Sequence, residues 1–461
     1  MKKIICISLI FSLVFAVGCK KSSVKKQISN CEIIVEYLDG AIKGSVEYEY
    51  FLPSRGIKKV IFNLYPNAFK EYEGCFTIKK VSVDKNDVEW QYIGETSQFL
   101  SIELPKRADS AEKIKIFIEF ECILKECKQR LGIAGDVVNI AFFYPIPCAF
   151  NNGEYLMQPY LEIGDPFCLD FYNFDITFTL PSVFTIASGV TVKGIDILGE
   201  KTTYFCNLKN ATNFACSLSE KYHVVSKKWG DKRVNYYFTQ DEAPESKLEL
   251  IINALDYFNE KIGSYAYDNF SVATSDYLLN GMEYSAFCVI KNGLNNINFE
   301  NAVVHEIAHQ WIGQAVCFNE YESGYFDEGL TEFLTALYLA DTKKEGLEKR
   351  INYAKILFNT FVSEQCKKDK NYKSVIKKGL NEFCDEMEYQ ILAYEKGFLF
   401  FNHLNDKLNG ELLKYLTAFY KKHIFERVNE DDFINVFKSK KKSVKAEFDK
   451  IVFFGDNYFV A

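Results

Sequence analysis

Two histidines and two glutamates at defined spacing form the most reactive pattern in this sequence. His305 and His309 are one helical turn apart, so both imidazoles lie on the same face of a helix and can bind one metal ion. Glu306 lies about 100° around that helix, where it can accept a proton from a metal-bound water. Eighteen residues separate His309 from Glu328, which supplies a third ligand. Two imidazoles and one carboxylate leave the fourth position of zinc open, which is typical of a catalytic site.

Histidine is rare in this chain, which makes the pattern more specific. The sequence contains five histidines, and two of them fall in the segment from His305 to His309. The alternative interpretation is a buried amphipathic helix whose histidines are satisfied by hydrogen bonds. Glu328 favours the metal site, although a glutamate at the start of a helix also stabilises the helix dipole without any metal.

The elements that precede this pattern have the period of β-strands. From residue 31 to residue 225, polar and apolar side chains mostly alternate, as they do in half-buried strands. We therefore predict an N-terminal all-β domain over residues 31–225, either a sandwich or a large open saddle. The clearest runs are residues 113–120, 45–52, 59–64, 174–180 and 185–192.

The period changes from strands to helices at Pro244. An amphipathic helix begins there, and a short strand is expected over residues 270–274. The metal-binding helix is expected over residues 299–316, and a second helix over residues 328–340. Because the rest is mainly helical, we predict an α+β protein of several domains, with a catalytic domain over residues 226–461.

The N-terminus has the pattern of an export signal. Two lysines precede an apolar run over residues 4–17, which is short for a membrane span. The run ends in Ala-Val-Gly before Cys19, which resembles the lipobox of bacterial lipoproteins with alanine where leucine is commonest. We therefore expect a signal peptide over residues 1–18, then a lipidated Cys19 and a tether over residues 19–30. The alternative is an ordinary signal peptide followed by a chance cysteine.

Composition sets further bounds on the class of protein. About 430 residues remain after the tether, enough for two or three domains with a large core. The net charge of −7 gives no indication of a nucleic-acid partner. The 14 cysteines include no C-x-x-C pair, so neither disulfide connectivity nor oligomeric state follows from the sequence.

The residues around the metal pattern resemble the aminopeptidase N family of gluzincin zinc metallopeptidases. Residues 309–313 (HQWIG) and 325–329 (YFDEG) are similar to the family's sequence around the ligands, although the family more often has asparagine in place of Asp327. Residues 281–284 (GMEY) resemble its Gly-x-Met-Glu-Asn signature. Residues 394–397 (YEKG) resemble the segment that carries the catalytic tyrosine.

This resemblance implies a fold and a cofactor. The fold is a β saddle followed by a thermolysin-like catalytic domain, without the long C-terminal helical-repeat domain that many members carry. The cofactor is one Zn²⁺ per chain, held by His305, His309 and Glu328. The expected partners are peptides with a free N-terminus. The lipobox-like sequence before Cys19 separately implies a bacterial membrane as a partner, with the protein in the periplasm or on the cell surface.

The resemblance also implies roles for individual residues. Glu306 corresponds to the general base and Tyr394 to the phenol that donates a hydrogen bond to the oxyanion. Glu283 corresponds to the carboxylate that binds the α-ammonium of the substrate, within a signature that also contains Gly281 and Met282. A peptide anchored in this way presents its first peptide bond to the metal.

We therefore predict an exported, lipid-anchored zinc aminopeptidase that uses a zinc-bound water as its nucleophile. One rival is a zinc endopeptidase of the same fold, in which Glu283 does not define the substrate terminus. Another is a surface binding lipoprotein with weak catalysis, against which the intact set of reactive residues argues. Two residues have structural alternatives: Glu283 as a surface carboxylate, and Tyr394 as a packed aromatic with Tyr389 as the reacting phenol.

Overall fold

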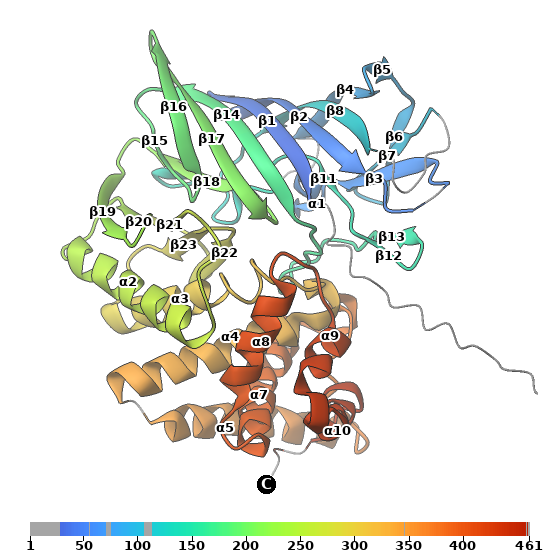
Figure 1. Ribbon diagram of the computed structural model, residues 1–461, viewed down its shortest axis with the longest axis vertical. Helices are drawn as coiled ribbons and strands as arrows, with labels where there is room; N and C mark the ends of the chain where they lie inside the picture. The colour runs from blue at the N-terminus through green and yellow to red at the C-terminus, as the bar shows by residue number, and fades with distance from the viewer. Residues whose placement is uncertain are drawn as a thin grey trace, which may run out of the picture.

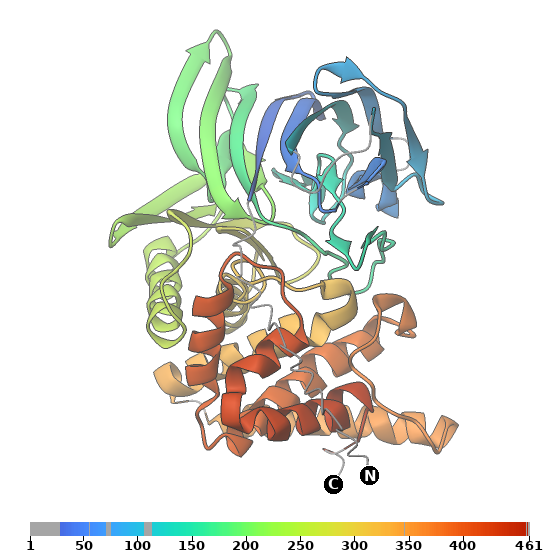
Figure 2. The same cartoon turned by 45° about the vertical axis from the view of Figure 1, so that its right-hand side comes forward.

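The computed structural model has a β-rich half and a helical half, with a smaller sheet between them (Figures 1 and 2). This arrangement confirms the predicted fold class of an all-β N-terminal domain followed by a mainly helical catalytic domain. The predicted signal peptide and Cys19 lie outside the described residues, which are 28–54, 56–70, 75–105, 113–344, 346–457 and 459.

The N-terminal half is built on an eight-stranded sheet with the order β16-β17-β14-β1-β2-β8-β4-β5. Strand β8 shows why this sheet forms, because its residues alternate between exposed and buried along its length, and the buried ones are apolar. The strand predicted over residues 113–120 is thereby confirmed. The strands are β16 (Thr191–Leu198), β17 (Lys201–Ala211), β14 (Tyr172–Pro181), β1 (Ser29–Leu38), β2 (Ala41–Phe51), β8 (Lys113–Ile123), β4 (Phe76–Val83) and β5 (Asn86–Asp87).

Two four-stranded sheets and a short hairpin complete this half. The first sheet has the order β15-β18-β10-β9, the second has the order β11-β3-β7-β6, and β12 pairs with β13. Their bounds are β15 (Thr185–Ala187), β18 (Ala215–Ser219), β10 (Val137–Ala141), β9 (Leu131–Ala134), β11 (Ile146–Pro147), β3 (Lys59–Asn63), β7 (Phe99–Glu103), β6 (Trp90–Ile93), β12 (Phe150–Asn151) and β13 (Glu154–Tyr155).

The single strand predicted over residues 185–192 is wrong. The segment forms the ends of two strands, β15 and β16, which belong to different sheets. Between them the backbone approaches the second half of the chain so closely that a Cβ at Gly189 would lie 2.1 Å from the carbonyl oxygen of Ala286. The strand therefore ends where the backbone packs against the next domain, a contact that no local period encodes.

A five-stranded sheet with the order β19-β20-β21-β23-β22 opens the second half. The predicted boundary at residues 225/226 falls inside its first strand. Helices α2 (Pro244–Lys261) and α3 (Asn296–Ala308) pack against this sheet, and β22 forms one of its edges. The strands are β19 (His223–Trp229), β20 (Lys232–Phe238), β21 (Asn269–Ser275), β23 (Phe287–Lys291) and β22 (Gly281–Tyr284).

The remaining chain is helical around an aromatic core. Phe326, Phe401 and Phe433 pack edge to face, with ring centroids 5.0–6.4 Å apart. None of the helices in the described ranges combines the length and apolar composition that crossing a membrane requires. The main segments are α4 (Glu320–Lys343), α5 (Leu347–Lys368), α6 (Glu386–Tyr389), the π-helical η3 (Gln390–Lys396), α7 (Gly397–Lys407), α8 (Leu412–His423), α9 (Glu430–Ile434), α10 (Lys441–Glu447) and the π-helical η5 (Phe448–Phe453).

The two helices predicted around the metal pattern have different bounds in the structure. Helix α3 ends at Ala308 instead of residue 316, and the turns that follow it include Gly313, whose φ of +125° favours glycine. Helix α4 begins at Glu320 instead of residue 328, and it contains a kink at Ser323. The hydroxyl of Ser323 donates a hydrogen bond to Glu430, which stabilises this irregular turn.

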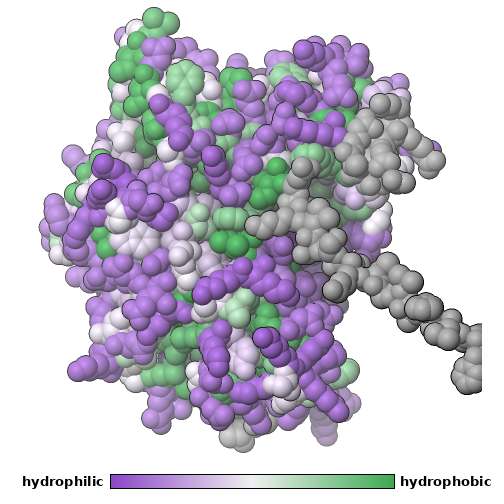
Figure 3. Space-filling model, viewed as in Figure 1, coloured by the Kyte–Doolittle hydropathy of each residue, from purple (hydrophilic) through white to green (hydrophobic). Residues whose placement is uncertain are grey.

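The surface is mostly hydrophilic, but hydrophobic residues gather over the hairpin of β16 and β17, at the upper left of Figure 3. Strand β16 is the edge of the eight-stranded sheet, and Ile195, Ile197 and Leu198 on it are exposed. These three residues are not among those that line the cavity at the metal pattern.

Two glycines allow α4 to approach η3 and α7 closely. A Cβ at Gly329 would lie 2.5 Å from the Cα of Gly397, and a Cβ at Gly397 would lie 2.8 Å from the Cα of Gly329. Gly329 follows Glu328 on α4, and Gly397 lies three residues after Tyr394. This backbone contact therefore fixes the distance between the elements that carry the third ligand and the predicted catalytic phenol.

Replacing Gly329 by alanine should lower the thermal unfolding midpoint. The new methyl group meets backbone atoms that cannot rotate away, and such overpacking typically costs about 1–3 kcal/mol. Gly346→Ala is the matched control, because nothing lies within 4 Å of its Cβ position. Equal midpoints for the two variants in differential scanning calorimetry would show that the contact does not constrain the helices.

Candidate active site

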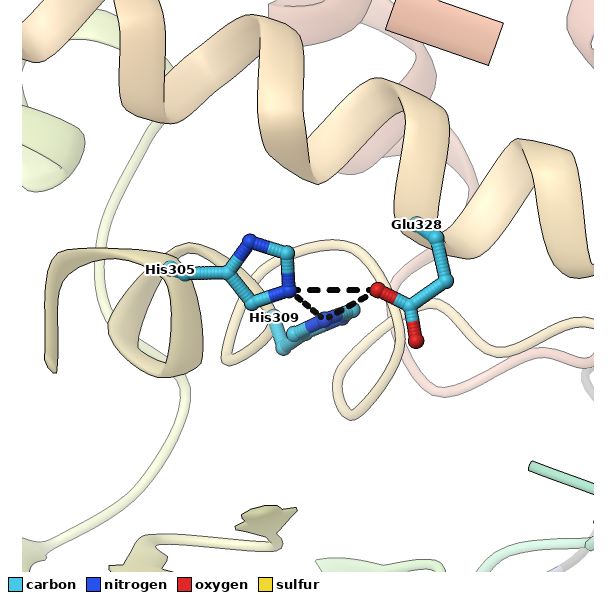
Figure 4. A group of neighbouring side chains, drawn as sticks. All are labelled: His305, His309 and Glu328. Carbon is cyan, nitrogen blue, oxygen red and sulfur yellow. Dashed lines mark hydrogen bonds and ion pairs between the residues drawn. The ribbon is translucent and has the colours of Figure 1, made fainter. Parts of the chain in front are cut away.

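His305 of α3, His309 directly after that helix, and Glu328 of α4 converge to form a possible metal site (Figure 4). His305 Nε2 lies 3.1 Å from Glu328 Oε2 and 3.2 Å from His309 Nε2, and the third edge, from His309 Nε2 to Glu328 Oε2, is 3.6 Å. Ligands about 2.0–2.1 Å from a tetrahedral zinc are separated by about 3.3 Å. The donor atoms thus fit three corners of a zinc coordination sphere.

Local sequence explains why α3 presents its histidines in this way. The helix begins after Asn295, whose side-chain oxygen accepts a hydrogen bond from the backbone N–H of Asn298. Its apolar residues, including Val303, Val304 and Ile307, are buried against the sheet and fix the rotation of the helix. The histidines therefore face the cavity instead of the core.

Each metal-facing histidine has a second carboxylate on its other ring nitrogen. His309 Nδ1 lies 3.1 Å from Asp327 Oδ1, and His305 Nδ1 lies 3.1 Å from Glu332 Oε1. Such outer partners fix the ring orientation and raise the basicity of metal-binding histidines. Sequence reasoning named Asp327 as a departure from the family pattern and missed Glu332, although its position one helical turn after Glu328 was a usable signal.

The carboxylates around the two histidines favour a positive charge at the centre of the donor triangle. Burial alone lowers the pKa of His305, but hydrogen bonds to Glu328 and Glu332 outweigh it and raise the pKa to about 10. Burial raises the pKa of Glu328, but hydrogen bonds from His305 and His309 dominate and lower it. A divalent cation bound to the same donor atoms replaces the protons that the carboxylates hold on the imidazoles.

Glu306 lies beside the triangle and packs against Gly281. A Cβ at Gly281 would lie 2.3 Å from Glu306 Oε1, so the absence of a side chain at this position makes room for the carboxylate. Glu306 is buried, and burial raises its pKa to about 7, although His305 and His309 partly oppose this shift. Its carboxylate is thus close to the metal donors without being one of the three.

Glu283 lies on the edge strand β22 and faces the same cavity as Glu306. Its side chain is buried, and a ligand atom of Glu283 lies within 4.8 Å of one on Glu306 and one on His309. Burial raises the pKa of Glu283 strongly, and His309 only partly offsets the effect. The interpretation of Glu283 as a surface carboxylate does not agree with this position.

The N-terminal domain contributes a carboxylate that sequence reasoning missed. Asp165 lines the cavity and forms a buried ion pair with Arg130. Both residues precede the catalytic half by more than fifty positions and belong to no motif, so the sequence held no signal for them. The cavity has a volume of about 340 Å³ and is lined by Asp165, Leu279, Asn280, Gly281, Met282, Glu283, Asn298, Asn301, Ala302, His305, Glu306, His309, Glu328, Glu332, Gln390 and Tyr394.

The two candidate phenols occupy different environments. Tyr394 lines the cavity, and its ring lies nearly parallel to that of His305, with centroids 6.2 Å apart and an interplanar angle of 11°. Tyr389 is fully buried, with its hydroxyl so close to Gly164 and Gly324 that a Cβ at either glycine would lie 2.7 Å from it. This geometry favours Tyr394 as the group that meets a substrate.

Parts of this chain share sequence with known proteins. Residues 246–451 match the model of the peptidase family M1 domain. Leucine aminopeptidase 2 of Candida albicans is 28% identical over 148 residues, which are 29% of this chain and 24% of that protein. Leucine aminopeptidase 2-1 of Scheffersomyces stipitis is 26% identical over 147 residues, 29% of this chain and 23% of that protein. The matched region spans about a quarter of the length of these relatives.

Solved structures share the fold over most of the chain. A mutant M1 zinc metallopeptidase from Deinococcus radiodurans superposes with a TM-score of 0.63 at 12% identity, covering 94% of both chains. The same mutant bound to a Tyr-Ser-Ala substrate gives a TM-score of 0.62 at 12% identity, covering 93% of this chain and 94% of that one. At this identity the likeness shows the fold.

The fold and the donor triangle together define a metallopeptidase with a thermolysin-like catalytic domain, whose cofactor is Zn²⁺. Residues 246–451 form a peptidase family M1 domain, in agreement with the predicted resemblance to the aminopeptidase N family. The individual roles of Glu306, Tyr394 and Glu283 stay predictions.

Zinc content should separate the ligands from the general base. Wild-type protein should hold about one zinc per chain, and His309→Ala should lose it, because two donors do not complete the site. Glu306→Gln should keep the metal and lose several orders of magnitude in turnover. His223→Ala, at an exposed histidine of β19, is the control. Elemental analysis that found full zinc in His309→Ala would refute the ligand assignment.

Proposed function

We propose that this protein is a zinc-dependent aminopeptidase, which hydrolyses the first peptide bond of peptides with a free N-terminus. The observation that carries the proposal is the buried Glu283, whose carboxylate lies within 4.8 Å of a ring nitrogen of His309 at the metal site. A buried carboxylate needs a positive partner, and an α-ammonium group supplies one. The relatives named leucine aminopeptidase and the structure with a bound tripeptide support this class of substrate.

In this proposal, each side chain around the metal site has a distinct task. Zinc held by His305, His309 and Glu328 would supply Lewis-acid polarisation of the scissile carbonyl and lower the pKa of the attacking water. The carboxylate of Glu306, next to the donor triangle, accepts the proton of that water and later delivers it to the leaving amine. Tyr394 donates its phenolic hydrogen bond to the oxyanion, where a fixed donor is most effective.

Substrate positioning depends on Glu283 and Asp165, two acidic residues that line the cavity. Glu283 binds the α-ammonium, while Asp165 adds negative potential that Arg130 partly neutralises. Because a free N-terminus is held a fixed distance from the metal, only the first peptide bond reaches the nucleophile. An N-acetylated peptide has no charge to bind and carries extra bulk next to these acidic residues.

Glu283→Gln should reduce cleavage of free N-termini selectively. A charge-assisted contact of this kind is worth about 1.5–3 kcal/mol, or roughly ten- to a hundred-fold in kcat/KM. Cleavage of matched N-acetylated peptides, followed by chromatography, should stay near zero in the wild type, so the ratio of free to blocked rates should fall in the variant.

Tyr394→Phe is the matched control for this experiment. It removes an oxyanion donor instead of an ammonium partner, so it should lower kcat without selecting between substrates. If the wild-type protein cleaves N-acetylated peptides internally as fast as it trims free ones, the endopeptidase alternative replaces the aminopeptidase.

We also propose that the protein is exported and anchored by a lipid on Cys19, on the basis of the export signal and the lipobox-like sequence before it. Strand β1 begins at Ser29, so the nine intervening residues span at most about 30 Å. The β-rich N-terminal half would then stay close to the membrane surface.

Cys19→Ser should release the protein from the membrane fraction or leave its signal uncleaved. The reason is that the thiol of Cys19 is the proposed acceptor of the lipid. Fractionation with immunoblotting, together with mass spectrometry of the mature N-terminus, measures both outcomes. Cys31→Ser, at a buried cysteine of β1, is the control for general misfolding. A wild-type protein that is wholly soluble and cleaved at another position would contradict the anchor.

A further inference from the structure

A continuous chain of ion pairs joins the metal site to the segment that carries the phenol. His305 Nδ1 lies 3.1 Å from Glu332 Oε1, and Glu332 Oε2 accepts a hydrogen bond from Arg350 Nη2 at 2.9 Å. Arg350 Nη1 donates to Glu395 Oε2 at 2.6 Å, and Glu395 directly follows Tyr394. One guanidinium group, from α5, therefore contacts both α4 and η3.

The surroundings of Arg350 favour a specific bridge over a loose surface ion pair. The side chains of Glu332, Arg350 and Glu395 are 22%, 24% and 14% exposed, so water screens their contacts only partly. The guanidinium also lies over the ring of Phe398, 4.4 Å from its centroid. A planar group with donors on two edges can bind two carboxylates at once, whereas a lysine ammonium cannot hold both in one plane.

The segment that carries the phenol depends on such contacts for its position. Tyr394 lies in the π-helical stretch Gln390–Lys396, a conformation that is rare and occurs mostly at functional sites. Both residues after Tyr394 are anchored by their side chains: Glu395 by Arg350, and Lys396 by backbone carbonyls that include those of the C-terminal segment. Only the first of these anchors leads to the metal site.

We propose that Arg350 is a positioning residue that couples the orientation of His305 to the placement of Tyr394. Through Glu332 it fixes the imidazole that binds the metal, and through Glu395 it fixes the register of the phenol that meets the oxyanion. For the placement of Tyr394, the inference rests on the proposed function. For the orientation of His305, it rests only on the geometry of the donor triangle.

Arg350→Met should weaken both ends of the bridge while keeping the volume of the side chain. Zinc affinity, measured by competition with a chromogenic chelator, should fall about ten-fold or more, as it does when outer partners of metal-binding histidines are lost. With zinc supplied in excess, kcat should fall about ten- to a hundred-fold while KM changes little. Arg350→Lys should restore only part of either loss.

Single substitutions at Glu332 and Glu395 should separate the loss of zinc affinity from the loss of kcat. Glu332→Gln removes the charge next to His305, so zinc affinity should fall. Glu395→Gln leaves that contact intact, so zinc affinity should stay within about twofold while kcat falls. Combining Arg350→Met with Tyr394→Phe should give a smaller additional loss of kcat than Arg350→Met causes alone, because both act on the same phenol.

Arg427→Met is the control for a merely structural role. Arg427 is half-buried, pairs with Asp170 at 3.3 Å and lies outside the cavity lining. The Arg427→Met variant should have a lower unfolding temperature than the wild type and an unchanged zinc affinity. The proposal is overturned if Arg350→Met behaves like this control, with zinc affinity and kcat within twofold of the wild type, or if its effect on kcat is undiminished in the Tyr394→Phe background. A wild type that releases no N-terminal residue would refute the proposed function, yet the zinc titrations of Arg350→Met and Glu332→Gln would still test the bridge.

Discussion

Buried negative charge around one cavity is the constraint on which the rest of this site depends. Glu283, Glu306 and Glu328 are each less than a tenth exposed, and Asp165 approaches them from the other domain. An ionised carboxylate loses several kcal/mol of hydration on burial unless a positive group compensates for it. Arg130 compensates for Asp165 within the protein. The remaining carboxylates favour cations, so the charges that oppose folding also make this cavity a site for positively charged ligands such as Zn²⁺.

Close packing of α4 against η3 and α7 determines how the side chains around the cavity are placed. Gly329 and Gly397 let α4 meet η3 and α7 at backbone distance, and each glycine lies within three residues of a side chain that lines the cavity, Glu328 or Tyr394. A side chain at either position would separate the metal ligand from the phenol. The glycines of the two motifs are thus required by packing at the site, and Gly281 has a similar role because it makes room for the carboxylate of Glu306.

The N-terminal domain is a wall of the active site and not a separate appendage. It supplies Asp165 to the cavity, its Gly164 packs against the hydroxyl of Tyr389, and its Gly189 contacts the backbone of Ala286 next to β22. These contacts join the edge strand that carries Glu283 to the all-β half. A peptide that enters the cavity therefore meets surfaces from both domains, which the motifs of the catalytic half alone do not indicate.

The sequence by itself determined the features that depend on backbone periodicity. Any helix through His305 and His309 places both rings on one face, and the alternation along β8 required a half-buried strand. Only the tertiary structure decided where α3 ends and that Arg350 and Asp165 reach the site. The physical reason is that side-chain period is a local property of the chain. Contacts between residues tens to hundreds of positions apart depend on how whole elements pack, which no short stretch specifies.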